Sequence, residues 1–268
     1  MIHFIKTVIV AICFTSISSW ADISPFIQQA VENEFRDGDF KKRDKFRHPA
    51  ETLAFFEFNH GQTVVEIWPA TGWYTEILAP ALNGNGTFIA AHFSPESKVQ
   101  FFRSTRSTFQ DKMTGTPAAY NQVKITTLEL PAETQIAEAN SADRIYTFRN
   151  VHNWMRNNTE QAVFDAMYKA LKPGGIMGVV EHRAKPQTTR EFMVKSGYVS
   201  EDYVISLAET AGFQLTDKSE INANPVDLTD HPNGVWTLPP TLRIDSSSKL
   251  RYLAIGESDR MTLKFRKP

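Results

Sequence analysis

The sequence has one cysteine, no excess of charge of either sign and no long hydrophobic run. Cys13 is the only thiol among 268 residues, so the chain can form no internal disulfide. The 29 basic and 30 acidic side chains give a net charge of -1 and are scattered, which is unlike the basic surface of a nucleic-acid-binding protein. No apolar stretch approaches the roughly 20 residues of a transmembrane helix. We therefore expect no nucleic-acid partner and, after residue 21, no stable membrane anchor.

The first 21 residues have the pattern of a cleavable signal peptide. Lys6 precedes a short apolar run over residues 8–14, and Ser19 and Ala21 place small side chains just before a cleavage site at Asp22. The alternative is a buried N-terminal helix. The pattern favours export, to a periplasm or out of the cell, as a mature chain of residues 22–268.

Apolar residues with alternating strand and helix spacing indicate an α/β fold. Expected strands cover residues 63–67, 87–91, 123–128, 144–148, 176–181, 213–221 and 261–265. Expected helices cover residues 73–82, 94–108, 157–171 and 200–211, the second beginning at Ser94 and Pro95. This order predicts a doubly wound, mainly parallel sheet. We expect a helical extension over 22–59 and one α/β domain over 60–268, with an insertion at 222–251.

A doubly wound sheet binds ligands at the carboxyl ends of its strands, beside the first strand. The loop there, residues 66–72 (EIWPATG), has one glycine, Gly72, and carries Ala70 where nucleotide-binding loops have another. The loop by itself is compatible with a nucleotide site or with an ordinary strand-to-helix turn.

This loop and two later segments resemble motifs of class I S-adenosylmethionine-dependent methyltransferases. Residues 143–151 and the Leu-Lys-Pro-Gly-Gly turn at 171–175 are similar to the quinone-biosynthesis methyltransferases. Residues 47–52, 72–78, 150–154 and 256–261 resemble a family of exported bacterial proteins described as predicted methyltransferases. The resemblance implies a Rossmann-like seven-stranded methyltransferase sheet with an antiparallel last strand, helices on both faces and an N-terminal helical extension.

The resemblance also implies S-adenosylmethionine as cofactor and a set of residues that bind it. These are Glu66, Pro69, Ala70, Gly72, Tyr74, His92, Thr127, Arg149 and Asn150. Glu66 is expected near the methionine part of the cofactor. His92 ends the second strand, where the family usually has an acid that accepts both ribose hydroxyls, and a neutral histidine accepts only one. Thr126 or Thr127 stands where an acidic or amide residue usually meets the adenine amine.

Histidines supply the expected chemistry. His152 is expected to be the base or to orient the substrate, because its ordinary pKa lies near working pH, with Asn153 beside it. Expected substrate-binding residues are His48, Trp154 and His182, although His152 also fits a capping role and Trp154 a core position. Glu181 and His182 end the fifth expected strand and, with His152 and His48, offer an alternative metal site. No paired-histidine spacing of a zinc site is present, so we expect no metal.

Two charged segments have alternative interpretations. Arg43, Asp44, Arg47 and His48 belong either to a lid over the cofactor or, more commonly for such a run, to a solvated helix. Glu257, Asp259 and Arg260 fit a turn before the last strand.

The sequence thus predicts an exported S-adenosylmethionine-dependent methyltransferase that acts on a small-molecule acceptor, aromatic or quinone-like in character. The alternative is a non-catalytic methyltransferase-like scaffold that binds another ligand or a partner protein. Ala70, His92 and the threonines at 126 and 127 support the alternative because they depart from the family pattern. A serine hydrolase is excluded, since the chain has no Gly-x-Ser-x-Gly motif.

Overall fold

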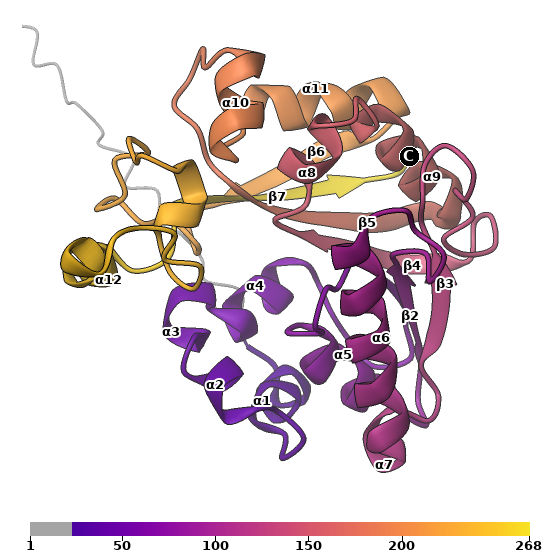
Figure 1. Ribbon diagram of the computed structural model, residues 1–268. Coiled ribbons are helices and arrows are strands. Elements are labelled where there is room, and N and C mark those ends of the chain that lie inside the picture. Colours follow the sequence, from indigo (N-terminus) through magenta and orange to yellow (C-terminus); the bar gives the residue numbers. More distant parts are fainter. Residues whose placement is uncertain (1–22) are drawn as a thin grey trace, which may run out of the picture.

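A seven-stranded sheet forms the centre of the computed structural model, which describes residues 23–268 (Figure 1). The strands are β1 (Thr63–Ile67), β2 (Thr87–His92), β3 (Lys124–Thr127), β4 (Ala142–Phe148), β5 (Leu171–His182), β6 (Gln214–Ser219) and β7 (Arg260–Arg266). Their order in the sheet is β3-β2-β1-β4-β5-β7-β6. Strand β7 is antiparallel to both its neighbours, and the other pairs are parallel. This confirms the predicted fold class.

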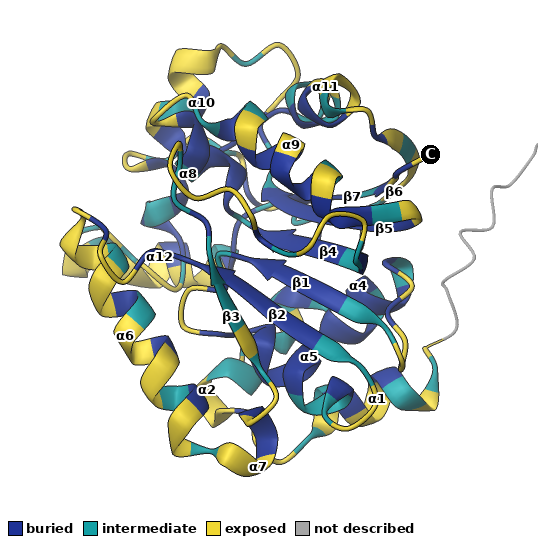
Figure 2. Cartoon of the chain, turned by 90° about the vertical axis from the view of Figure 1, so that its right-hand side faces the viewer, coloured by how far each residue is buried: buried dark blue, intermediate teal, exposed yellow. Residues whose placement is uncertain are grey.

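Helices cover both faces of the sheet, which buries the central strands on two sides (Figure 2). One face carries α8 (Val151–Met155), α9 (Glu160–Ala170) and α11 (Glu201–Ala211), and the core there contains Trp154, Phe164 and Met167. The other face carries α5 (Thr75–Leu82), α6 (Gln100–Gly115) and α7 (Pro117–Tyr120). Buried β-branched residues such as Val64 and Val65 explain why β1 was predictable from the sequence.

Four short helices precede the sheet: α1 (Pro25–Glu32), α2 (Gly38–Lys41), α3 (Asp44–Arg47) and α4 (Pro49–Phe55). Helix α1 packs on α5, and Ile27 and Leu53 join the same apolar core as Ile77. The signal peptide predicted at residues 1–21 lies outside the described residues. No helix within residues 23–268 has both the length and the apolar character needed to cross a bilayer.

The chain reverses direction between β1 and β4. It runs outward from β1 through β2 to β3, and returns to form β4 on the opposite side of β1. Ile67 and Thr147 are register partners at the carboxyl ends of these two strands. This is the topological switch point where open α/β sheets bind ligands.

Several predicted boundaries were wrong. Helix α6 begins at Gln100, not at Ser94, because residues 94–97 form a turn in which the Ser94 hydroxyl accepts a hydrogen bond from the Glu96 backbone at 3.2 Å. Strand β5 begins at Leu171, which pairs with Ala142 before a register shift, so the Pro-Gly-Gly segment lies within the strand. Helix α9 spans Glu160–Ala170, and neither α8 nor α10 (Arg190–Ser196) was predicted.

The segment between β6 and β7 contains no strand within residues 220–259. It holds two 3-10 turns, η1 (Gly234–Thr237) and η2 (Ser246–Ser248), and helix α12 (Lys249–Ile255).

Candidate functional site

A pocket of about 210 Å³ opens at the carboxyl ends of β1 and β4. Its wall is formed by the loop after β1, the start of α5, the residue after β2, the start of α6 and the loop after β4. Seven residues proposed from the sequence lie in this wall: Glu66, Pro69, Ala70, Tyr74, Arg149, Asn150 and Asn153. The remaining seven do not line it: Gly72, His92, Thr127, His48, Trp154, His152 and His182.

Glu66 presents a buried carboxyl group to the pocket. Its side chain is almost inaccessible, and Oε2 accepts a hydrogen bond from the Thr75 hydroxyl at 2.7 Å. Burial raises the pKa of Glu66 to about 8, although the Thr75 hydrogen bond and the charge of Arg149 oppose this shift. A ligand that brings a positive charge close to the carboxyl favours its ionised form. The position therefore fits a cationic group.

The loop after β1 has the backbone of a glycine-rich loop with few glycines. Trp68 and Ala70 adopt left-handed conformations, with φ angles of 47° and 53°. Gly72 has a φ of 88°, and a Cβ atom there would lie 3.3 Å from the Phe109 ring. The Asn150 amide donates to the Ile67 carbonyl at 2.9 Å and helps to fix the turn. Ala70 thus adopts the conformation expected of the glycine it replaces, at a steric cost.

His92 is fully buried and its ring is engaged by the protein itself. Nδ1 accepts a hydrogen bond from the Phe93 backbone at 2.7 Å, and Nε2 lies 2.9 Å from the Ala70 carbonyl oxygen. Burial lowers the pKa of His92 to about 4. Thr127 is the register partner of His92 on β3 and also stays out of the pocket wall. Neither residue offers a polar atom to a ribose or an adenine here.

Aromatic rings form the apolar wall of the pocket. Phe93 and Phe102 stack at 4.2 Å between centroids, and Trp68 contacts Phe93 at 4.7 Å. Tyr74 and Phe148 stack at 3.5 Å on the other side. Such walls bind flat rings, and their faces attract cations.

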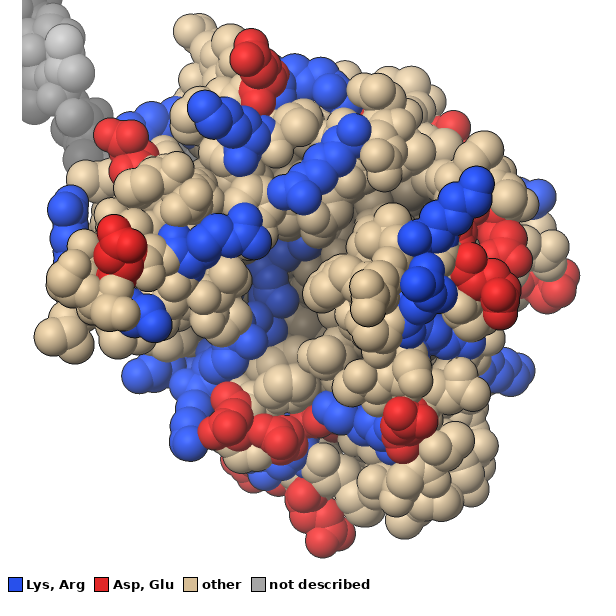
Figure 3. All heavy atoms as spheres, viewed as in Figure 1, with Lys and Arg blue, Asp and Glu red and all other residues tan. Residues whose placement is uncertain are grey.

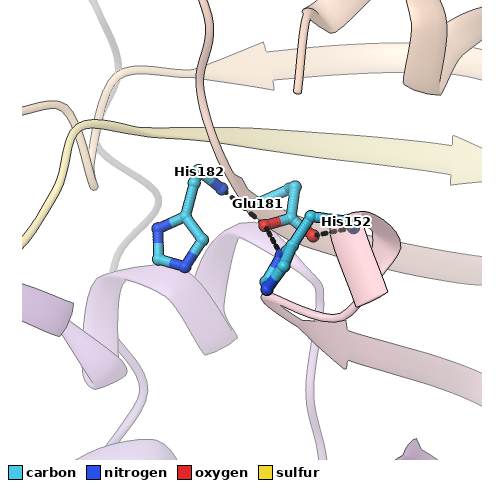
Figure 4. Close-up of side chains that lie close together, drawn as sticks. All are labelled: His152, Glu181 and His182. Atoms are coloured by element: carbon cyan, nitrogen blue, oxygen red, sulfur yellow. Dashed lines mark hydrogen bonds and ion pairs between the residues drawn. The ribbon is translucent and has the colours of Figure 1, made fainter. Parts of the chain in front are cut away.

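His152, Glu181 and His182 form a separate cluster at the ends of β4 and β5 (Figure 4). His152 Nδ1 lies 3.0 Å from Glu181 Oε1, and the two histidine rings are 5.2 Å apart. The side chain of Glu181 is fully buried and also accepts the backbone N–H groups of His152 and His182. Glu181 thereby orients the His152 ring.

The same three residues bring potential metal ligands within 4.8 Å of one another. Glu181, His182 and His152 were grouped with His48 as a possible metal site from the sequence; within residues 23–268 the structure brings the first three together and leaves His48 out of the group. Both Glu181 oxygens are engaged by N–H groups or by the His152 ring. The pKa of His182 is well below its ordinary value, through burial and then the charges of His152, Arg260, Arg149 and Arg47. Burial, the largest cause, therefore favours the neutral form of the His182 ring.

Trp154 and His48, which were also proposed to bind substrate, contribute to packing and to a helix connection. Trp154 is fully buried and packs edge-on against Trp68 and Phe164, at centroid distances of 6.0 and 6.2 Å. His48 links α3 to α4 in a left-handed conformation, and its Nδ1 is buried without a partner in residues 23–268.

Glu257 and Asp259 lie in the irregular segment before β7, as expected of a turn, but Glu257 is buried. The helix near residue 43 is only partly solvated, because Arg47 is buried. Arg47 is 3% exposed, Arg260 1% and Glu257 3%. Glu257 accepts from Arg43 Nε at 2.6 Å, from Arg47 Nε at 3.2 Å and from Arg260 Nη2. Sequence reasoning missed this group because ion pairs between residues 210 or more positions apart leave no local pattern.

No protein-family model matches the sequence, and no curated protein matches it. Solved structures do match. A SAM-dependent methyltransferase from Aquifex aeolicus aligns with a TM-score of 0.52 at 16% identity, over 69% of this chain and 92% of its own. An arsenic(III) S-adenosylmethionine methyltransferase from Chlamydomonas reinhardtii aligns with a TM-score of 0.52 at 13% identity, over 90% of this chain and 73% of its own.

This chain has the class I methyltransferase fold. The cyclase SpnF also aligns, with a TM-score of 0.55 at 16% identity, over 88% of this chain and 85% of its own. Because that protein is named for a different reaction, the likeness establishes the fold and leaves the reaction to be argued from the site.

Proposed function

We propose that the protein is an S-adenosylmethionine-dependent methyltransferase that acts on a small-molecule acceptor. The observation that carries this proposal is the buried carboxyl of Glu66, which faces an aromatic-walled pocket at the switch point of a class I methyltransferase sheet. S-adenosylmethionine combines a cationic sulfonium and ammonium with a flat adenine, and this pocket offers a carboxyl and aromatic faces. The matched methyltransferases named above support the same reaction class.

Different residues of the pocket would bind different parts of the cofactor. Glu66 would hold the ammonium group, and the aromatic wall of Trp68, Phe93 and Phe102 would take the adenine and exclude water. The left-handed turn at Ala70 would let the backbone approach the cofactor closely. His92 would act through this turn, by holding the Ala70 carbonyl, and not by contact with the ribose.

His152 does not line the pocket itself but directly precedes Asn153, which does, and it is the proposed proton acceptor. S-adenosylmethionine supplies an electrophilic methyl group, and an oxygen or nitrogen acceptor must lose a proton when it is methylated. If the Nδ1–H of His152 donates to Glu181, its Nε2 carries the lone pair that a base needs. Asn153, the next residue along the chain, lines the pocket and would orient the acceptor.

Titration calorimetry of the purified protein with S-adenosylmethionine and S-adenosylhomocysteine tests the proposal. We expect dissociation constants in the micromolar range, which correspond to a binding free energy on the order of -8 kcal/mol. Glu66→Gln should weaken binding, whereas Glu220→Gln, an exposed control away from the pocket, should not. Absence of binding for both compounds would contradict the proposal.

A non-catalytic scaffold is the second candidate, and the placement of His92 and Thr127 favours it. In this structure neither side chain offers an acceptor to ribose hydroxyls. A scaffold would show no heat with either cofactor form and no methyl transfer to any acceptor.

We also propose that the protein is exported. Residues 1–21 support this through their charged flank, short apolar run and small residues before Asp22. N-terminal sequencing of the protein from the periplasmic or secreted fraction of its host should give Asp22 as the first residue. A chain that still begins at Met1 in the cytoplasm would contradict export.

A further inference from the structure

Four arginines gather beside the pocket around one carboxylate. Arg43, Arg47 and Arg260 all pair with Glu257, whose two oxygens are shared among them. Arg149 is the fourth, and its half-buried side chain lines the pocket without an ion pair to any carboxylate of residues 23–268. We call Arg43, Arg47, Arg149 and Arg260 the arginine cluster. Its members come from the N-terminal helices, the end of β4 and the start of β7.

The arginine cluster is not neutralised by the carboxyl groups around it. Glu257 balances one of the four positive charges. Glu66 has a pKa of about 8, so it is largely uncharged at neutral pH. Glu181 directs its oxygens to His152 and to the His182 backbone, not to an arginine. A buried excess of positive charge is costly to a folded protein unless an anion joins it.

Several hydrogen-bond donors of the arginine cluster are buried and unused. Arg43 Nη2, Arg47 Nη1 and Arg260 Nε have no partner within the described part of the chain. Buried polar groups are nearly always paired in folded proteins, so unused guanidinium donors in one place indicate a missing acceptor. Planar guanidinium groups are matched geometrically to carboxylate and phosphate oxygens.

The arginine cluster is reached through the pocket. Arg149 lies in the pocket wall, and so does Trp73, whose ring is contacted by the Arg47 guanidinium at 4.6 Å from its centroid. Figure 3 shows a central hollow in this face of the molecule with Lys and Arg side chains in its depth. An anion in the pocket therefore meets Arg149 first, with the remaining charges behind it.

We propose that the arginine cluster binds the carboxylate or phosphate group of the methyl acceptor. The proposal rests on the proposed methyltransferase function and narrows the acceptor to an anionic molecule. It also assigns direct contact to Arg149, the member of the cluster that lines the pocket, and positioning roles to Arg43, Arg47 and Arg260, which lie behind it around Glu257.

Binding of two simple anions tests the proposal. Sodium benzoate and inorganic phosphate would be titrated into the full protein, with and without saturating S-adenosylhomocysteine, and followed by calorimetry and thermal unfolding. We expect saturable binding that weakens about tenfold or more in Arg149→Gln, because it loses a charged hydrogen bond to the anion, and that weakens in Arg43→Gln, because it loses one of the positive charges behind Arg149. Preference for benzoate indicates a carboxylate acceptor, and preference for phosphate a phosphorylated one.

Arg266→Gln is the matched control. It removes the same charge from an exposed position at the far end of β7. It should change anion binding by less than about twofold, since exposed charges are screened by solvent and salt. If Arg266→Gln lost as much anion affinity as Arg149→Gln, overall charge would explain the loss, and the proposal would be overturned.

Glu257→Gln provides a test in the opposite direction. It removes the one counter-charge, so it should tighten anion binding while lowering stability, and added benzoate or phosphate should restore much of the lost thermal stability. Weaker anion binding in a folded Glu257→Gln protein would contradict the proposal.

The outcomes also separate this proposal from the function on which it rests. Anion binding with no binding of S-adenosylhomocysteine would refute the cofactor and leave the anion site standing. If instead the arginine variants weaken S-adenosylhomocysteine as much as they weaken benzoate, the arginine cluster holds the cofactor's own carboxylate, and the assignment to the acceptor is wrong.

Discussion

The Nε2 atom of His92 lies 2.9 Å from the carbonyl oxygen of Ala70 and ties the end of β2 to the loop after β1. Since Nδ1 accepts a hydrogen bond from the Phe93 backbone, the ring proton must be on Nε2, which donates to Ala70. The ring is therefore neutral, and protonating Nδ1 would break its bond to Phe93. His92 stabilises the turn in which Ala70 adopts a glycine-like conformation.

The neutral ring predicts a pH-dependent stability. Burial lowers the pKa of His92 from 6.5 to about 4, so the unfolded chain binds this proton at higher pH than the folded protein does. Stability should therefore fall with pH below 6.5, with a loss of about 2 kcal/mol between pH 7 and pH 5 from this residue. Urea unfolding of wild type and His92→Asn at both pH values measures it. An equal pH dependence in the two proteins would show that His92 is not the source.

Glu257 should be important for stability because three arginines share it. Burial raises the pKa of Glu257, but the charges of Arg260, Arg47 and Arg149 outweigh burial and hold it well below 4.5. Glu257→Gln should lower the free energy of unfolding at pH 7 by about 3 to 5 kcal/mol, since it leaves buried charges unpaired. In the wild type this contribution should decline progressively as the pH falls below about 4.5 and disappear only at the much lower pH at which Glu257 is protonated in the folded protein.

Glu220→Gln is a suitable comparison for Glu257→Gln. Glu220 pairs with Arg183, but its side chain is 70% exposed, so its loss should cost at most about 1 kcal/mol. Chemical denaturation of both variants at pH 7 gives the two values. Similar losses would mean that the Glu257 pairs are as weak as surface pairs.

Cofactor binding should release a proton from Glu66. The free carboxyl has a pKa of about 8, and an ammonium group beside it would lower that pKa and drive ionisation at pH 7. Calorimetry of S-adenosylhomocysteine binding in two buffers of different ionisation enthalpy counts the protons released. Glu66→Gln should release fewer protons than wild type, and an unchanged count would place the ammonium group elsewhere.

The loop after β1 should respond differently to two small substitutions. Gly72→Ala places a Cβ atom in a left-handed backbone and 3.3 Å from the Phe109 ring, so it should destabilise the protein by more than about 1 kcal/mol. Ala70→Gly removes a steric cost from a φ of 53° and should change stability by less than about 1 kcal/mol. Thermal unfolding and cofactor titration of both variants test this. If Ala70→Gly lowered the stability more than Gly72→Ala does, the left-handed backbone of the loop would not explain the effects.

Local patterns predicted the strands well and the helix starts less well. A β-branched run marked β1 and a mainly apolar run marked β2, because both strands are buried between helices on the two faces of the sheet. Ser94, Pro95 and Glu96 have the residue types of a helix start, but a turn uses the same preferences. The glycines at 174 and 175 indicated a loop, whereas the structure accommodates them beside a register shift within β5.

The site was predictable only where a motif could place it. The resemblance to methyltransferases predicted that Glu66 and Asn150 belong to the site, and both residues line the pocket. His92 was expected to contact ribose because of its position in the chain, but the direction of its side chain depends on packing that no motif records. The pairing of Arg47 with Glu257 likewise depends on tertiary contacts alone.

The arginine cluster closes a long loop of the chain. Arg43 and Glu257 are 214 residues apart in sequence, and Arg260 reaches the Phe46 carbonyl over the same separation. Closing a loop of this length costs entropy, which the ion pairs and the packing of the N-terminal helices must offset. Since Arg43 and Arg47 lie in the N-terminal helices whereas Glu257 and Arg260 lie just before and at the start of the last strand, the anion site is complete only when the two ends of the chain are folded together.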